Sequence, residues 1–334
     1  MPPMLELIVA GFMFVALIFY AVTGGADFGG GMWDLLATGV RADAQKNAID
    51  KAIAPIWEAD HVWLILVVVI LFTGFPPAFA AVMTALNIPF TLMLIGIVLR
   101  GSAFTFRKYD IKSQEVHRRW STLFGAASFF TPFIQGLTLG ALSTGEIRIV
   151  DGRLATGFFA GWLTPFALAC GLFALALFAF LAATYLTVDS RAEPDVQNDF
   201  RLRALWSGSA LAPIAFVVFI TSKDGAPAMY HGLTQWWAPL LVGATLCFAI
   251  AALTCLWLRR FVIARVVAIA EVTLILGGWS LSQYPNLITP DITIFNAAAP
   301  AITLRLLTYA LFAGAAVLFP SLFFLFRIFK GEKS

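Results

Sequence analysis

The sequence predicts an all-α polytopic membrane protein with about nine transmembrane helices. Of its 334 residues, 60% are hydrophobic and 12% are charged, and the mean hydropathy is +0.87. A soluble globular domain carries about 45–50% apolar and about 25% charged residues, so the composition excludes that class. The net charge of +3 is small and the basic residues form no single patch, which excludes a nucleic-acid partner.

Nine segments are long and apolar enough to cross a bilayer as helices of about 20 residues. Their expected bounds are 5–26, 54–75, 78–99, 121–142, 158–186, 204–222, 237–258, 262–282 and 302–327. The turn "TGFPP" joins the second and third segments and predicts an antiparallel hairpin. We expect one membrane domain over 1–334, with a four-helix bundle in 5–142 and a second bundle plus one peripheral helix in 158–327.

Lysine and arginine residues in the connections predict the orientation of the chain. Eighteen of them lie on one side, whereas the opposite side has only Arg148, Arg153, Lys223 and Arg305. This asymmetry predicts an outer N-terminus, a cytoplasmic C-terminus and an odd number of spans. The N-terminus has no basic region or small-residue cleavage site, so we expect its first apolar segment to be a span and not a signal peptide.

The stretch "TGGADFGGGMW" (23–33) places one carboxylate, Asp27, among glycines at the cytoplasmic end of the first span. Glycines such as Gly29 and Gly30 let helices approach closely or let a helix open. We therefore expect a narrow, water-accessible crevice around Asp27. The alternative is an interfacial carboxylate that faces water or pairs with a base. A nucleotide-binding loop is excluded, because no strand precedes the glycines and no P-loop lysine follows them.

The second span begins with a polar strip at a depth similar to that of Asp27. Glu58 and His61 are three residues apart and Trp57 and His61 four apart, so they share one helix face. Carboxylates beside a histidine suit proton uptake, because burial and neighbours shift their protonation toward neutral pH. The predicted proton-uptake residues are Asp27, Glu58, Asp60 and His61, supported by Trp57, Arg100, Gly29 and Gly30. The alternative, again, is a group of simple interfacial side chains.

Two further charged residues are expected near or within spans. Arg100 ends the third expected span. It could snorkel to the interface, or it could be the counter-charge of Asp27 or Glu58; the sequence leaves both interpretations open. Glu271 lies inside the eighth expected span, where we expect it to pair within the bundle.

The histidines predict that this chain ligates neither haem nor a metal ion. Only His61 lies within an expected span, whereas His117 and His231 lie in connections on opposite sides. No histidine pair, or histidine with methionine, sits at matched depths as axial haem ligands would. The three cysteines lie in apolar segments and are expected to be small buried side chains. No catalytic residue is expected in this chain.

Four motifs resemble, in order along the chain, those of subunit II of cytochrome bd-type quinol oxidases. "GGADFGGGMW" resembles the family's "DGFD-x-G-x-G-M", and "IAPIWEADHVWLI" resembles "APxW[DE]xNxVWLI". "LRGSAFTFR" resembles "RPxxFxxR", and "QYPNLI" resembles "FPxL". The "WE" form is more similar to the cyanide-insensitive branch. Two positions depart from the pattern: Gly24 replaces an aspartate, and Asp60 replaces an asparagine.

The resemblance implies a heterodimeric terminal oxidase of the bacterial inner membrane. Subunit I would carry b-type haems, haem d and the quinol site, and a small single-span subunit and membrane lipids would accompany the two. This chain would be haem-free, would stabilise subunit I and would contribute to cytoplasmic proton uptake. Asp27, Glu58 and Arg100 match the family's motif residues. From the buried carboxylates alone, a proton-coupled secondary transporter is the alternative.

Overall fold

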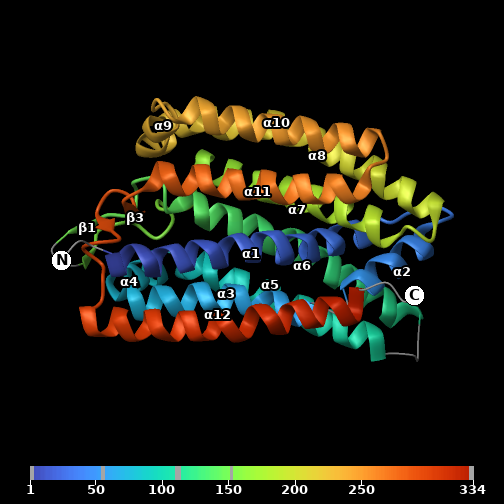
Figure 1. Ribbon diagram of the computed structural model, residues 1–334, viewed down its shortest axis with the longest axis horizontal. Helices are drawn as coiled ribbons and strands as arrows, with labels where there is room; N and C mark the ends of the chain where they lie inside the picture. Colours follow the sequence, from blue (N-terminus) through green and yellow to red (C-terminus); the bar gives the residue numbers. More distant parts are fainter. Residues whose placement is uncertain (1–3, 54–56, 110–113, 151–152, 331–334) are drawn as a thin grey trace.

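The computed structural model describes residues 4–53, 57–109, 114–150 and 153–330 (Figure 1). Its helices are α1 (Met4–Leu35), α2 (Ala42–Ile53), α3 (Trp57–Gly74), α4 (Pro76–Ala85), α5 (Asn87–Tyr109), α6 (Gln114–Ala141), α7 (Pro165–Asp189), α8 (Pro194–Gly225), α9 (Pro227–Leu233), α10 (Ala238–Trp257), α11 (Phe261–Gln283) and α12 (Ala301–Lys330). Two antiparallel hairpins complete the fold, β1 (Ile149–Val150) with β2 (Arg153–Leu154) and β3 (Asn286–Ile288) with β4 (Ile292–Thr293).

The long helices confirm the predicted all-α polytopic membrane fold. Within the described residues, eight helices are long and apolar enough to cross a membrane, and α3 with α4 makes a ninth candidate if that bent pair is one span. A helix satisfies its own backbone hydrogen bonds, which is why the apolar segments fold this way in lipid. The β-hairpins lie at one end of the bundle and α2 at the other (Figure 1). That the α2 end is cytoplasmic stays a prediction.

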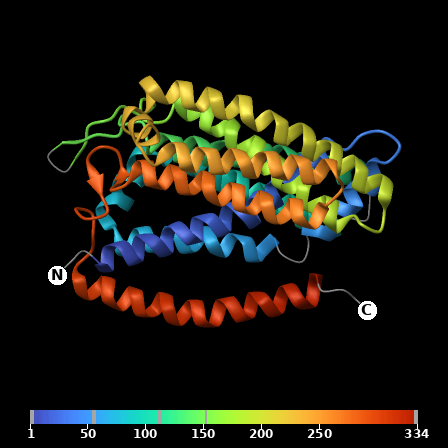
Figure 2. The ribbon, with the colours of Figure 1, turned by 45° about the horizontal axis from the view of Figure 1, so that its top comes forward.

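The helices contact one another in two groups. In the first group α1 packs against α3 and α6, and α5 packs against α6; in the second, α7 packs against α8 and α11, and α10 against α11. The groups meet where α7 contacts α1 and α6. Helix α12 lies against α1 and α3 at the edge of the molecule (Figure 2). The chain as a single membrane domain stays a prediction.

The first helix is longer than expected. Helix α1 continues through the glycine segment to Leu35, whereas the sequence predicts an end near residue 26. Glycine lowers helix propensity by about 1 kcal/mol relative to alanine in a solvated helix. Inside a packed bundle, however, an opened helix would leave backbone groups without water to bond them. The helix therefore persists, and Asp27 lies about 12 Å before its end.

The expected third span, 78–99, is also wrong in its bounds. The two prolines of "TGFPP" occupy the first turn of the short helix α4, where a missing N–H costs nothing. Helix α3 and α4 are bent by 118° from each other, and α5 then begins at Asn87. The chain therefore turns in two steps instead of one. As a result, Arg100 lies inside α5 and not at the end of a span.

The expected fifth span, 158–186, begins too early. Helix α7 starts at Pro165, and the Thr164 side chain caps it by accepting a hydrogen bond from the Ala167 N–H at 3.2 Å.

At the same end of the bundle, residues 284–300 fold over the helices. The Thr289 N–H donates to the Leu142 carbonyl (3.1 Å), and the Ala299 N–H donates to the Gly74 carbonyl (2.8 Å).

Candidate functional site

Asp27 and Arg100 form an ion pair inside the bundle. Their exposed fractions are 3% and 2%. Arg100 Nη1 donates to Asp27 Oδ2 at 2.6 Å, and Nη2 donates to Oδ1 at 2.8 Å and to the Asp27 carbonyl at 3.0 Å. Its Nε donates to Ser128 Oγ at 3.0 Å. This two-pronged geometry is the strongest form of an arginine–carboxylate pair. Of the two interpretations of Arg100, the structure shows the counter-charge of Asp27.

A second buried pair lies two helical turns further along the same helices. Arg107 Nη1 donates to Asp34 Oδ2 at 2.9 Å, and Nη2 donates to Asp50 of α2. Both aspartates of α1 and both arginines of α5 are seven residues apart, about 10.5 Å along a helix, so each set lies on one face. We call Asp27–Arg100 and Asp34–Arg107 the Asp–Arg ladder. The sequence reasoning missed its second pair, although the seven-residue repeat was a signal for it.

Phe124 of α6 separates the two rungs of the Asp–Arg ladder. The Cζ atoms of Arg100 and Arg107 each lie 4.8 Å from the centre of its ring, and the side chain is fully buried. Phe28 adds a second aromatic face 4.7 Å from Arg100. Aromatic faces attract cations and do so more strongly where water is excluded. The ladder is therefore held in place by aromatic packing as well as by hydrogen bonds.

The glycines around Asp27 bring α1 into close contact with its neighbours. A Cβ atom at Gly29 would lie 2.0 Å from the Phe178 carbonyl oxygen of α7, and one at Gly31 would lie 2.1 Å from Ser128 Oγ of α6. Close helix approach, the first of the two expected roles, is thus the one that the structure shows. The expected water-accessible crevice is wrong, because the same close contacts leave Asp27 only 3% exposed.

Two adjacent glycines of α1 should respond differently to alanine. At Gly29 the new Cβ meets a backbone atom, whereas at Gly30 it meets only side-chain atoms of Ile53 and Ile49, the nearest of them 2.8 Å away at the end of Ile53. We expect Gly29→Ala to destabilise the protein by about 3 kcal/mol or more, as overpacking does. Gly30→Ala should be nearly neutral, because Ile53 can turn away. Thermal denaturation of the two purified variants in the same detergent compares them, and equal losses would contradict the close approach of α1 and α7.

Asp60 and His61 of α3 lie beside the Asp–Arg ladder. Asp60 is 1% exposed and is close enough to Tyr20 and Tyr185 to interact electrostatically with both phenols. The Tyr20 hydroxyl in turn accepts a hydrogen bond from Gln135 of α6. The His61 ring lies edge-on to Phe28, with ring centres 6.2 Å apart. Phe28 also contacts Arg100, so the structure brings Asp27, Arg100, Asp60 and His61 into one region.

Two predicted residues lie only partly within the described structure. Trp57 and Glu58 form the first turn of α3, but their side chains are outside the part that the structure describes.

Glu271 of α11 was expected to pair with another side chain of the bundle. It is 4% exposed, and it makes no hydrogen bond or ion pair with any side chain that the structure describes. The expected pairing of Glu271 is therefore wrong as far as the described side chains are concerned.

The two histidines whose side chains the structure describes lie in different surroundings. Across residues 4–53, 57–109, 114–150 and 153–330, no three His, Cys, Asp or Glu side chains are arranged to hold a metal ion. His61 packs against Phe28, while His231 of α9 shares a 2.9 Å hydrogen bond with Gln235 at the surface. That this chain ligates no haem stays a prediction.

Comparison with known proteins places these observations in a family. The family model for cytochrome bd terminal oxidase subunit II matches residues 5–329. The chain is 26% identical to a putative cytochrome bd menaquinol oxidase subunit II of Bacillus subtilis, over 98% of this chain and 94% of that protein. It is 31% identical to a cytochrome bd-I ubiquinol oxidase subunit 2 of Escherichia coli, over 52% and 45% of the two chains. Its fold is similar to a chain of the bd oxidase from Geobacillus thermodenitrificans, with a TM-score of 0.78, 20% identity and 98% coverage of both chains.

Proposed function

This chain belongs to the cytochrome bd terminal oxidase subunit II family, and we propose that it is the haem-free subunit of a quinol oxidase. In this role it stabilises the haem-bearing subunit I and helps to carry protons from the cytoplasm toward the site of oxygen reduction. The family match supports a role in an oxidoreductase complex and not a secondary transporter, which would act as a single chain. The proton-carrying role is supported by the buried acidic residues at the α2 end of the bundle.

The Asp–Arg ladder and the start of α3 have different tasks in this proposal. Both carboxylate oxygens of Asp27 accept hydrogen bonds from Arg100, so this pair keeps its charges in place and fixes α1 to α5. Glu58 and His61 lie three residues apart on one face at the start of α3, and Asp60 lies about 100° around the helix from His61. Groups so spaced can pass a proton in short steps. The Asp–Arg ladder lies beside them and takes no part in the transfer.

The ladder also supports the stabilising role. It joins α1, α2 and α5 through side chains, while Gly29 and Gly31 let α1 pack closely against α7 and α6. Trp33 adds a link from α1 to α7, since its Nε1 donates to the Ala179 carbonyl at 2.8 Å. A first bundle fixed in this way offers subunit I a rigid surface, and a rigid surface loses less conformational entropy on binding.

We expect haem to be bound by the partner subunit and not by this chain. We expect the chain produced alone to show no Soret band, because only His61 is both within a span and able to ligate. The same tagged chain purified from its native membrane should bring a partner with the reduced-minus-oxidised spectrum of b- and d-type haems. A stoichiometric Soret band on the isolated chain would contradict the haem-free role, and a native preparation without any haem-bearing partner would contradict the oxidase assignment.

A further inference from the structure

Glu271 is a buried carboxyl group that the proposed proton route does not use. It lies near the midpoint of α11, about 15 Å along the helix from its start at Phe261. The residue is 4% exposed, and its Oε2 atom is shielded from solvent without a hydrogen-bond partner among the described residues. An ionised group at this depth would need a partner to offset its lost hydration.

The face of α11 that carries Glu271 packs against α10. Gly278 lies seven residues further along on the same face, and a Cβ atom there would come within 2.8 Å of the Leu241 side chain of α10. Helix α10 has no charged residue and no amide side chain. Its threonine hydroxyls, of Thr245 and Thr254, donate to carbonyls of α10 itself at 2.9 and 2.7 Å. Helix α10 therefore offers Glu271 neither a counter-charge nor an amide donor.

The helices that pack most closely against α11 carry no lysine or arginine. These helices are α1, α7, α9 and α10. Helix α9 has His231, but that ring shares a 2.9 Å hydrogen bond with Gln235 at the surface. Helix α11 itself has Arg265, which lies 3.6 Å from Asp189 of α7. The basic side chains within and around α11 are thus engaged by groups other than Glu271.

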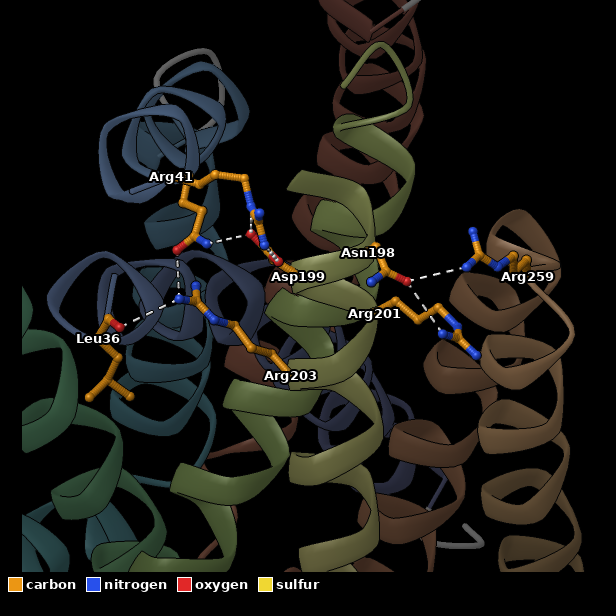
Figure 3. A network of polar contacts seen from close by, with 8 residues as sticks. Leu36, Arg41, Asn198, Asp199, Arg201, Arg203 and Arg259 are labelled. Carbon is orange, nitrogen blue, oxygen red and sulfur yellow. Dashed lines mark hydrogen bonds and ion pairs between the residues drawn. The ribbon is translucent and has the colours of Figure 1, made fainter. Parts of the chain in front are cut away.

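Two arginines near the connection between α10 and α11 are held at the α2 end of the bundle. Arg201 donates to the last two carbonyls of α10, at 2.8 and 3.1 Å. Arg201 and Arg259 also both lie 3.4 Å from Asn198 Oδ1 (Figure 3). These contacts keep both guanidinium groups at the ends of their helices. Among the described residues, Glu271 makes no ion pair.

A carboxylate at this position would be an uncompensated charge. Taking an ion out of water costs much more free energy than taking a neutral carboxylic acid out of water. In an apolar interior without a counter-charge, a carboxyl group therefore favours its neutral form. Asp27 shows the opposite case, because two N–H groups of Arg100 stabilise its carboxylate.

We propose that Glu271 is a second proton-binding site of this chain, which holds its proton in the resting complex at neutral pH. The site lies in the second helix group, apart from the uptake residues at the start of α3. A neutral acid has an O–H that can donate to a carbonyl oxygen of a neighbouring helix, which a carboxylate cannot do. The bound proton thus allows α11 to pack against α10 in lipid. This assignment holds whether or not the start of α3 carries protons.

Infrared spectroscopy of the purified complex tests this site, because a carboxylic acid and a carboxylate absorb at different frequencies. The spectrum of Glu271→Gln is subtracted from that of the unaltered complex at neutral pH. We expect the difference to contain the C=O band of one protonated acid per complex. Asp199→Asn is the matched control, since its carboxylate accepts hydrogen bonds from Arg41 and Gln45 (Figure 3). Its difference spectrum should contain carboxylate bands and no acid band.

The form of the lost band decides the outcome. Carboxylate bands in the Glu271→Gln difference spectrum, like those expected of the control, would overturn the proposal. Glutamine is neutral and similar in size, so we expect this variant to assemble with normal haem content. Should it fail to assemble, Glu271→Leu provides the same subtraction with an apolar side chain. Loss of the acid band in that variant supports the proposal, and loss of carboxylate bands contradicts it.

Discussion

Replacing Arg100 with glutamine should destabilise this protein far more than replacing any of its exposed arginines. Breaking a buried ion pair on one side costs about 3–5 kcal/mol, because the remaining charge is left without a partner in a dry interior. Arg100 is 2% exposed, and it donates to both oxygens of Asp27 and to Ser128. We expect a large fall in the denaturation temperature of the purified complex and a low yield of the variant.

The double variant Asp27→Asn/Arg100→Gln isolates the pairing from simple loss of packing. Because it removes both charges, it should lose less stability than the sum of the two single variants. Arg41→Gln is the matched control, since its pair with Asp199 has a similar two-pronged geometry but a side chain that is 52% exposed. Exposed pairs contribute about 0–1 kcal/mol. Equal losses in Arg100→Gln and Arg41→Gln would show that the ladder is not a buried anchor.

Replacing Glu58 with glutamine should slow quinol oxidation at nearly normal haem content. Glutamine keeps the size of the side chain but cannot exchange a proton. We expect turnover to fall about tenfold, equivalent to a rise of about 1.4 kcal/mol in the barrier. Glu58→Asp should restore part of the rate, because the carboxylate survives on a shorter stem. Oxygen consumption with excess quinol, divided by haem content, is the measurement.

Asp43→Asn on α2 is the matched control for Glu58→Gln. Asp43 lies at the same end of the bundle but is exposed, so its loss should leave turnover unchanged. If Glu58→Gln turns over at the wild-type rate with full haem, Glu58 is not part of the uptake route. If it loses haem, Glu58 supports folding, and Asp60→Asn then becomes the variant that tests the start of α3.

The membrane fold could be predicted because each span has to satisfy a simple length and polarity requirement. The apolar segments at 204–222, 237–258 and 262–282 lie within or nearly coincide with α8, α10 and α11. The prediction was wrong where packing overrides local preference. The glycines of α1 suggested an end near residue 26, yet their contacts with α6 and α7 keep the helix intact.

The candidate site could be predicted only in part, for a related reason. Asp27 stands out in the sequence because it interrupts an apolar run, and Arg100 is a natural partner for it. Arg107 and Asp34 were missed because both fall in expected connections when the first span is expected to end near residue 26 and the third at residue 99. The two-step turn after "TGFPP" shifts α5 along the chain, and that shift buries both arginines beside α1.

Proton uptake during a single turnover tests the proposed role of this chain most directly. The reduced oxidase is mixed with oxygen, and a pH-indicator dye follows protons leaving the solution while absorbance follows haem oxidation. In Glu58→Gln we expect proton uptake and the later haem steps to slow together by about tenfold, whereas Asp43→Asn should follow the unaltered enzyme. Uptake by Glu58→Gln at the unaltered rate, with full haem content, would contradict proton delivery through the start of α3.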